Sequence, residues 1–541
     1  MKKLLALLLV FLMLTLTFTG CSEGTNDVSS GNDVSSDVSS EDEADEVEVS
    51  SDEEPSSEPE ETIEDEPEYE EPEYDFEDED EDFEDVPLTP EQQRLENMLA
   101  GEDEELNKDA LYSEGDLSRL AKAMNKSKGG KEVTIVFYGN GTNTGRLMDA
   151  SNADNLYCSL VEEWWEANIG PCKIIRAGTE NLTSITACMR VDHDVLRYEP
   201  DVVFLDFAVQ DGIQSMASSN ALGYDNLIRR ILQCKSAPAI ISLMLTGAEQ
   251  QSFTMNPLNA TLFASAAKEQ KKVAEYYNLA VIDFEQSFWD NSVEVVEVTT
   301  KKEIPLINWE TISTSNTVMN DDGHMILAGT IKYYLQIVLN KLGKISTKDC
   351  AYPTEGFFSN NKYMTGSYVS LGDIIEGKAQ GYSLNLDTLA LSKNEYAYTA
   401  ENIDNPMTPI IKTWRHFDFI EGVHDEKWVY KEENPEYLTV TFPKAIEGDS
   451  YFLFSTTMSV GTRAPDSSSP MYSYHPITVE CYNEDGGHLG TVKPATSNFK
   501  ETTTLGKSTT VKLHDGTAKI TIKVYTSVGS VYLHGLSNFE K

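Results

Sequence analysis

Two residues in the second half of the chain could carry acid–base chemistry. Asp321 and His324 lie three residues apart, directly before the apolar run MILAGTIKYYLQIVL, which predicts a helix. A histidine supported by a carboxylate can act as a general base and activate water. An alternative stays open, in which Asp321 or Asp322 caps the N-terminus of this helix and His324 is a buried, hydrogen-bonded histidine.

The cysteines do not point to a metal or redox site. The chain has 7 cysteines. Cys21 stands apart near the N-terminus, and no pair among the others has the close spacing of a zinc or redox motif. We therefore expect most of them to be small buried hydrophobic residues, and we expect no cofactor and no metal.

Aromatic side chains suggest a place for a glycan. Trp289 and Trp309 lie in a loop-rich stretch before the Asp321 and His324 pair, where the rim of a pocket would form. Indole rings at such a rim could stack on a sugar, so both are candidate ligand-binding residues. His193 has charged neighbours on both sides, which favours a place on the surface over a ligating role.

Alternating strands and helices must position these residues. Short apolar, β-rich runs are followed by helical stretches five times between about residues 131 and 344, which predicts a parallel sheet covered on both faces. Ligands bind such sheets at the carboxyl ends of the strands. The predicted strands are 133–138, 173–177, 201–207, 239–245 and 279–284, and the predicted helices between them are 156–168, 185–198, 224–234 and 263–277.

Five sequence blocks in this region follow one another in a characteristic order. They read VTIVFYGNGTNTG, EEWWEANIGPCKIIRAGTENLTS, VLRYEPDVVFLDFAVQD, KVAEYYNLAVIDF and DDGHMILAGTIKYYLQIVL. In this order they resemble the SGNH (GDSL-like) hydrolases, especially the bacterial branch that acts on carbohydrate esters. The resemblance implies a flavodoxin-like, three-layer α/β domain and ester hydrolysis, with His324 as the general base and Asp321 as the residue that orients it.

The chain departs from the family at three functional positions. Gly141 stands where the family has its serine nucleophile, Asn181 replaces a glycine whose N–H helps to hold the oxyanion, and Gln210 replaces an asparagine donor. Loss of the nucleophile from such a relay lowers kcat by about 10⁶. Two routes to hydrolysis stay open, namely the hydroxyl of the adjacent Thr142 and a water activated by His324.

The N-terminal part predicts a membrane anchor and a tether. Met1 to Gly20 contains two lysines and an apolar run, and the sequence Phe18 to Cys21 resembles a bacterial lipobox, which implies a lipid on Cys21 and attachment to the outer face of the cell membrane. Residues 22–90 hold 32 acidic residues and no Lys or Arg, so we expect a disordered tether. The net charge of -49 argues against nucleic acid as a partner.

The C-terminal part predicts a second folded domain. Runs such as YLTVTF, ITVECY and AKITIKVY alternate apolar and polar residues and are separated by turn sequences, which is typical of a jelly-roll-like all-β sandwich. The predicted organisation is a signal peptide (1–21), an acidic tether (22–90), a helical lead-in (91–130), the SGNH hydrolase-like domain (131–344), a connecting region (345–415) and the β-sandwich domain (416–541).

These features support two functional hypotheses. In the first, the protein is a cell-surface lipoprotein with a catalytically degenerate SGNH fold that binds carbohydrate or another extracellular ligand. In the second, it is an active carbohydrate esterase or deacetylase that uses Thr142 or a water activated by His324. A partner glycan or acylated polysaccharide fits both hypotheses.

Overall fold

The computed structural model describes residues from 88 to 539. The chain divides into two units, Met1–Asp82 and Phe83–Lys541, and every described residue lies in the second. Cys21 and the predicted tether up to residue 87 are therefore outside the described residues. The other stretches outside them are 140–153, 178–181, 214–216, 246, 248–257, 292, 296–302, 310, 314–317, 349–351, 376, 386–410, 416–435, 459–476, 494–506, 525–528 and 540–541.

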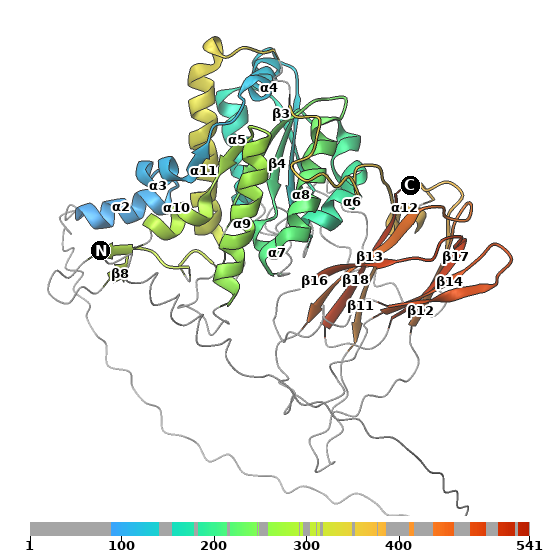
Figure 1. Ribbon diagram of the computed structural model, residues 1–541. Helices are drawn as coiled ribbons and strands as arrows, with labels where there is room; N and C mark the ends of the chain where they lie inside the picture. The colour runs from blue at the N-terminus through green and yellow to red at the C-terminus, as the bar shows by residue number, and fades with distance from the viewer. Residues whose placement is uncertain are drawn as a thin grey trace, which may run out of the picture. The chain divides into compact units, whose positions relative to one another are not determined.

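A six-stranded sheet forms the centre of the α/β domain, in the order β1-β6-β5-β4-β2-β3 (Figure 1). Strands β2 to β6 pair in parallel, which confirms the five predicted strands. Their residues are almost all buried because both faces of the sheet are covered. The bounds are β1 (Leu111–Ser113), β2 (Val133–Gly139), β3 (Cys172–Arg176), β4 (Val202–Asp206), β5 (Ala239–Leu243) and β6 (Ala280–Ile282).

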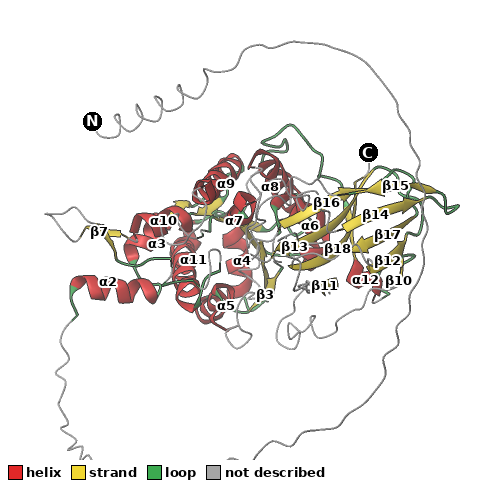
Figure 2. Cartoon of the chain, turned by 90° about the horizontal axis from the view of Figure 1, so that it is seen from below, coloured by secondary structure: helices red, strands yellow, loops and turns green. Residues whose placement is uncertain are grey.

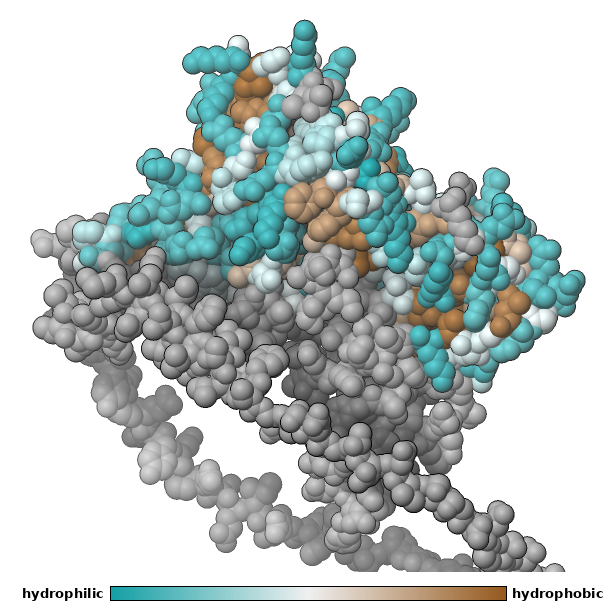
Figure 3. Space-filling model, viewed as in Figure 1, coloured by the Kyte–Doolittle hydropathy of each residue, from teal (hydrophilic) through white to brown (hydrophobic). Residues whose placement is uncertain are grey.

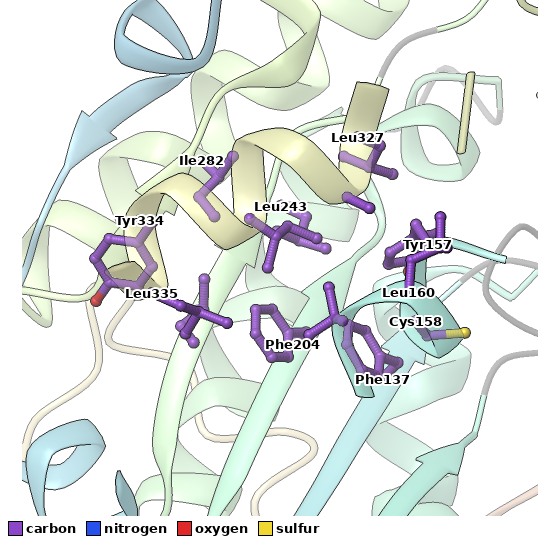
Figure 4. Close-up of a cluster of buried hydrophobic side chains, with 14 of the residues drawn as sticks. Phe137, Tyr157, Cys158, Leu160, Phe204, Leu243, Ile282, Leu327, Tyr334 and Leu335 are labelled. Carbon is purple, nitrogen blue, oxygen red and sulfur yellow. The ribbon is translucent and has the colours of Figure 1, made fainter. Parts of the chain in front are cut away.

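Helices cover both faces of this sheet and give the domain three layers. On one face, Phe137 and Phe204 of the sheet pack with Tyr157 and Leu327 in a single apolar core (Figure 4). That face is covered by α4 (Ser118–Lys128), α5 (Tyr157–Asn168) and α11 (Asp321–Lys341). The other face is covered by α6 (Ser184–Asp194), α8 (Ala217–Leu232) and α9 (Leu258–Tyr276). Shorter elements are α7 (Ala208–Ile213), α10 (Phe284–Asn291), η3 (Leu196–Tyr198), η4 (Leu342–Lys344), β7 (Val293–Val295) and β8 (Glu303–Pro305).

The predicted helical lead-in is an integral part of the α/β domain. It contains α2 (Pro90–Leu99), α3 (Glu104–Ala110) and α4, but also β1, which pairs antiparallel with β6 and forms one edge of the sheet. Met98, Leu106 and Leu120 from this segment are buried in the same core as the sheet. The boundary predicted near residue 130 is therefore wrong, because this segment buries its apolar face on the domain that follows.

The C-terminal part forms a β-sandwich, as predicted. Two sheets, in the orders β10-β12-β17-β14-β15 and β11-β18-β13-β16, enclose an apolar core, and β9 adds to the second sheet through β18. Strands β9 to β11 come from the predicted connecting region, so the sandwich begins earlier than residue 416. The elements are β9 (Ser367–Ser370), α12 (Leu371–Ile375), β10 (Ser383–Asn385), β11 (Ile411–Arg415), β12 (Glu436–Thr441), β13 (Asp449–Met458), β14 (Ile477–Tyr482), β15 (His488–Val492), β16 (Lys507–Lys512), β17 (Lys519–Val524) and β18 (Gly529–Phe539).

A buried ionic network joins α6 to the β-sandwich, which Figure 2 shows beside this helix. The guanidinium of Arg190 binds the carboxylate of Asp194 through Nε at 2.9 Å and contacts Nδ1 of His534 at 2.9 Å through Nη1. His193 lies between Asp194, at 2.8 Å, and Asp373, at 3.1 Å. The prediction that His193 lies on the surface is wrong, because α6 turns this side chain into the contact with the sandwich.

The described cysteines behave as expected. None of the five that the structure describes is in a disulfide. Burial raises the pKa of the Cys158 thiol to about 11, so this group stays protonated and unreactive. Cys158, Cys172, Cys188 and Cys481 are buried, Cys234 is half-buried, and Cys350 lies outside the described residues.

The visible surface of the described part is mostly hydrophilic (Figure 3). Its large hydrophobic side chains with substantial exposure are scattered singly or in a pair, and they are Leu88, Tyr112, Tyr276, Phe357 and Leu489. None of the described helices is both long and apolar enough to cross a membrane.

Candidate functional site

Strands β2 and β4 end side by side at the carboxyl edge of the sheet, where ligands bind in folds of this kind. Gly139, the last residue of β2, pairs with Asp206, the last residue of β4. A Cβ atom on Gly139 would collide with the backbone carbonyl of Asp206, so this close approach requires glycine. The candidate nucleophile positions Gly141 and Thr142 follow directly after Gly139 and lie outside the described residues.

His324 lies in the first turn of α11, facing this edge. The cap of α11 is Asn320, whose side chain accepts the N–H of Gly323 at 3.1 Å. The alternative that Asp321 or Asp322 caps this helix is therefore wrong, because the residue before them already does so. His324 is only 1% exposed and its ring stacks on that of Tyr157, with 5.8 Å between ring centroids.

The contacts of His324 fix which of its nitrogens carries the proton. Nδ1 accepts a hydrogen bond from the backbone N–H of Tyr157 at 3.3 Å. This N–H belongs to the first turn of α5, where backbone N–H groups have no partner within the helix. Burial lowers the pKa of His324 to about 4, against the opposing effect of the Asp321 charge. At neutral pH the ring is therefore neutral, with its proton on Nε2, and Nε2 is a donor rather than a base.

Asp321 does not orient His324 through a hydrogen bond. Its Oδ2 accepts from the side-chain amide of Asn155 at 2.8 Å, and its Oδ1 has no partner. Among the described contacts, no hydrogen bond joins Asp321 to His324. A histidine that acts as general base in a Ser-His-Asp relay has a carboxylate on Nδ1, whereas a backbone N–H occupies this atom of His324.

The structure separates the other predicted site residues. Gln210 is buried in α7, directly after β4, and so lies at the carboxyl edge as predicted, whereas Asn181 lies outside the described residues. Trp309 is fully buried in the core, with its ring edge-on to Phe288 at 6.2 Å. The prediction that Trp309 stacks on a glycan is wrong, because the ring has no exposed face. Trp289 is half-buried and also packs against Phe288.

Two polar side chains at this edge were not singled out from the sequence. Asp206 is 2% exposed, and among the described residues neither of its carboxyl oxygens has a hydrogen-bond partner. Burial, followed by the charge of Asp211, raises the pKa of Asp206 to about 8. The hydroxyl of Tyr157 is also buried and unpartnered. The available signal was the carboxyl group of Asp206 at the end of the otherwise apolar strand Val202–Asp206.

The neighbouring carboxyl group shows that full pairing is possible here. Asp211, in α7, accepts the backbone N–H of Ser184 at 2.9 Å and the side-chain amide of Gln270 at 2.8 Å. Burial raises the pKa of Asp211 to about 7 against these hydrogen bonds. Within the part of the chain that the structure describes, no group of His, Cys, Asp and Glu side chains could hold a metal ion.

Comparison with solved structures finds the same two-domain arrangement. A two-domain esterase (CEX) active on acetylated mannans, co-crystallised with mannopentaose, matches with a TM-score of 0.51 and 19% identity over 80% of this chain and 98% of that chain. A second structure of a two-domain esterase (CEX) active on acetylated mannans matches with a TM-score of 0.51 and 18% identity, over 80% of this chain and 99% of that one. This chain therefore shares the two-domain fold of these structures, an α/β domain followed by a β-sandwich.

The similarity is one of fold. Axe2, an acetylxylan esterase from Geobacillus stearothermophilus, matches over 38% of this chain and 94% of its own, at 18% identity and a TM-score of 0.28. No protein-family model and no curated protein matches the sequence. The comparison with the two-domain esterases therefore shows the fold of the α/β domain and of the β-sandwich, while the chemistry depends on the residues of the site.

Proposed function

We propose that this protein is a cell-surface lipoprotein whose SGNH-type domain binds acylated carbohydrate and has lost efficient ester hydrolysis. The observation that carries this proposal is the state of His324, whose Nδ1 accepts the N–H of Tyr157 and whose Nε2 therefore holds a proton. A histidine in this state cannot take a proton from a nucleophile at Nε2. Gly141, at the position of the family serine, supplies no hydroxyl to attack an ester.

The proposed ligand class is an acetylated polysaccharide, with acetylated mannan as the first candidate. The similar two-domain esterase is described as active on acetylated mannans. Binding of a glycan depends on hydrogen bonds and stacking rather than on the nucleophile, so it can persist when the reactive groups are replaced.

The alternative is an active esterase that uses Thr142 or a water activated by His324. Either route needs the lone pair of His324 on Nε2 and the proton on Nδ1. The hydrogen bond from the Tyr157 N–H to Nδ1 would have to break, and a carboxylate would have to replace it. This requirement disfavours the alternative but leaves it open to a direct test.

The test uses the chain from Ser22 onward, with binding and acetate release measured on acetylated mannan. We expect the unmodified chain to bind and to release acetate no faster than His324→Ala. Gly141→Ser restores the hydroxyl without the base, and because the relay acts as a unit we expect it to gain little turnover. Turnover by the unmodified chain that disappears in His324→Ala would contradict the proposal and favour the active esterase.

The proposed anchor is tested separately. A lipid on Cys21 would hold the protein at the outer face of the cell membrane, and the acidic segment 22–90 would keep the folded domains away from it. We expect Cys21→Ala to move the protein from the membrane fraction to the medium. Equal membrane association of both forms would rule out lipidation at this residue.

A further inference from the structure

Two polar side chains, Asp206 and Tyr157, interact electrostatically at the carboxyl edge of the sheet, and a third, His324, stacks on Tyr157. Phe204 and Phe137 face the helices α5 and α11, and their rings stack at 4.5 Å between centroids. Side chains two residues apart on a strand point to the same face, so Asp206 faces the same helices as Phe204. Tyr157, which Figure 4 shows beside Phe137, packs edge-on against that ring at 5.4 Å between centroids. Its ring also stacks on that of His324.

Two of these side chains lack hydrogen-bond partners. Both carboxyl oxygens of Asp206 and the hydroxyl of Tyr157 are buried without a partner in the described part of the chain. Buried polar groups are nearly always paired, because an unpaired group loses its hydrogen bonds to water and gains nothing in exchange. The carboxyl group of Asp211, five residues further along, accepts three hydrogen bonds at similar burial, two from Ser184 and one from Gln270. The fold can therefore satisfy a carboxyl group in this region, and it does not do so for Asp206.

We infer that Asp206 and Tyr157 form a binding site for the carbonyl oxygen of an acyl group on a carbohydrate, beside His324. This inference rests on the proposed function and specifies which part of the ligand the site reads. A carbonyl oxygen accepts two hydrogen bonds and donates none. The hydroxyl groups of a protonated Asp206 and of Tyr157 are two donors, and they match its two lone pairs.

The protonation states agree with an uncharged ligand. Burial raises the pKa of Asp206 to about 8. Burial also raises the pKa of the Tyr157 hydroxyl well above its usual value, and the nearby Asp206 adds to this rise. Both groups therefore carry their protons at neutral pH. The titratable groups that interact electrostatically with Asp206 are Tyr157 on α5, Asp211 on α7 and Tyr224 on α8. His324 on α11 stacks on Tyr157 and is neutral at neutral pH, so these groups include no cation. Without a neighbouring positive charge, the site favours a neutral ester carbonyl over a free carboxylate.

The experiment compares acetylated and deacetylated mannopentaose, by calorimetric titration of the chain from Ser22 onward. Asp206→Val and Tyr157→Phe each remove one donor, so we expect each to weaken binding of the acetylated sugar about tenfold and to leave the deacetylated sugar unaffected. Asp206→Asn keeps a donor and cannot ionise, so we expect it to bind within about threefold of the unmodified chain. Asp225→Asn is the matched control, since Asp225 is also buried with one unpartnered oxygen but pairs with Tyr277 and the N–H of Phe357.

A pH series gives a second readout that does not depend on the folding of Asp206→Val. The unmodified chain should lose its preference for the acetylated sugar between about pH 7 and about pH 9.5, as Asp206 ionises. Asp206→Asn should keep the preference across this range. An unchanged preference in Tyr157→Phe and Asp206→Val, or an identical pH dependence in Asp206→Asn, would overturn this site and leave the proposed function standing. Failure of the unmodified chain to bind either sugar would overturn the proposed function and this site together.

Discussion

The α/β domain buries polar side chains in two places and treats them in opposite ways. In the network between α6 and the β-sandwich, Asp194 accepts hydrogen bonds from Arg190 at 2.9 Å, from His193 at 2.8 Å and from the hydroxyl of Tyr138 at 3.2 Å. At the carboxyl edge of the sheet, Asp206 accepts none. Both carboxyl groups are about 2% exposed, so their difference comes from partners and not from burial.

The pKa values of the two carboxyl groups express this difference. Burial alone would raise the pKa of Asp194, but the Arg190 guanidinium and the hydrogen bond from His193 lower it to about 2. The pKa of Asp206 rises to about 8 because burial meets no opposing cation. Asp194 thus holds Arg190 and His193, which in turn contact His534 and Asp373 of the C-terminal part, whereas the neutral Asp206 has no such partner among the described residues.

The largest expected loss of stability comes from a substitution that breaks the ionic network between α6 and the β-sandwich. Asp194→Asn leaves the buried Arg190 without its counter-charge, so we expect the free energy of unfolding to fall by about 3–5 kcal/mol, measured by urea unfolding at neutral pH. The contribution of Asp194 is present above about pH 4 and is lost as the pH falls towards its folded pKa of about 2. The stability difference between the unmodified chain and Asp194→Asn should therefore shrink below about pH 4.

An exposed ion pair provides the control for this experiment. Lys272 and Glu269 lie at 2.6 Å on α9, and both side chains are substantially exposed to solvent. Glu269→Gln should cost less than about 1 kcal/mol, because solvent screens the pair. Equal costs for Asp194→Asn and Glu269→Gln would show that the network contributes no more than a surface contact.

The next effect has the opposite sign. Asp206→Val removes an unpaired polar group and introduces a β-branched residue, which strands favour. We therefore expect the free energy of unfolding to rise by about 1–2 kcal/mol at neutral pH. Because the folded pKa of Asp206 is raised to about 8, the unfolded chain loses this proton near pH 4 while the folded protein keeps it. The stability of the unmodified chain should therefore fall between about pH 4 and about pH 8, relative to Asp206→Val. A loss of stability in Asp206→Val would mean that this carboxyl group has a partner in solution.

The sequence predicted the framework of this domain well, because strands buried on both faces are continuous apolar runs. DVVFLDF and AIISLML could hardly form anything else between two helical stretches. It could not predict that β9 to β11 join the sandwich, since pairing between strands far apart in the chain leaves no local signal. The edge strand β1 was not predicted either, because three residues are too few to show the alternation of apolar and polar residues that is typical of a strand.

The site was harder to predict than the framework. Spacing placed His324 and Asp321 at the start of one helix correctly, but it could not reveal that the Tyr157 N–H occupies Nδ1, a contact between residues 167 positions apart. Trp309 was misplaced because a tryptophan in a loop-rich stretch can turn either outward or into the core, and here it packs against Phe288. Hydrogen-bond partners are properties of the folded chain, and they decide whether a histidine is a base or a donor.

The smallest expected change in stability comes from removing one tyrosine hydroxyl in each of the two regions, so it compares them most directly. Tyr138 and Tyr157 are both fully buried, and both lie close to a buried aspartate. The hydroxyl of Tyr138 donates to the carbonyl of Ala187 at 2.8 Å, whereas the hydroxyl of Tyr157 has no partner. Tyr138→Phe should therefore lower the free energy of unfolding by about 1 kcal/mol, and Tyr157→Phe should leave it unchanged or raise it slightly, by thermal or urea unfolding. If Tyr157→Phe costs as much as Tyr138→Phe, the hydroxyl of Tyr157 is paired within the folded protein and is not held ready for a ligand.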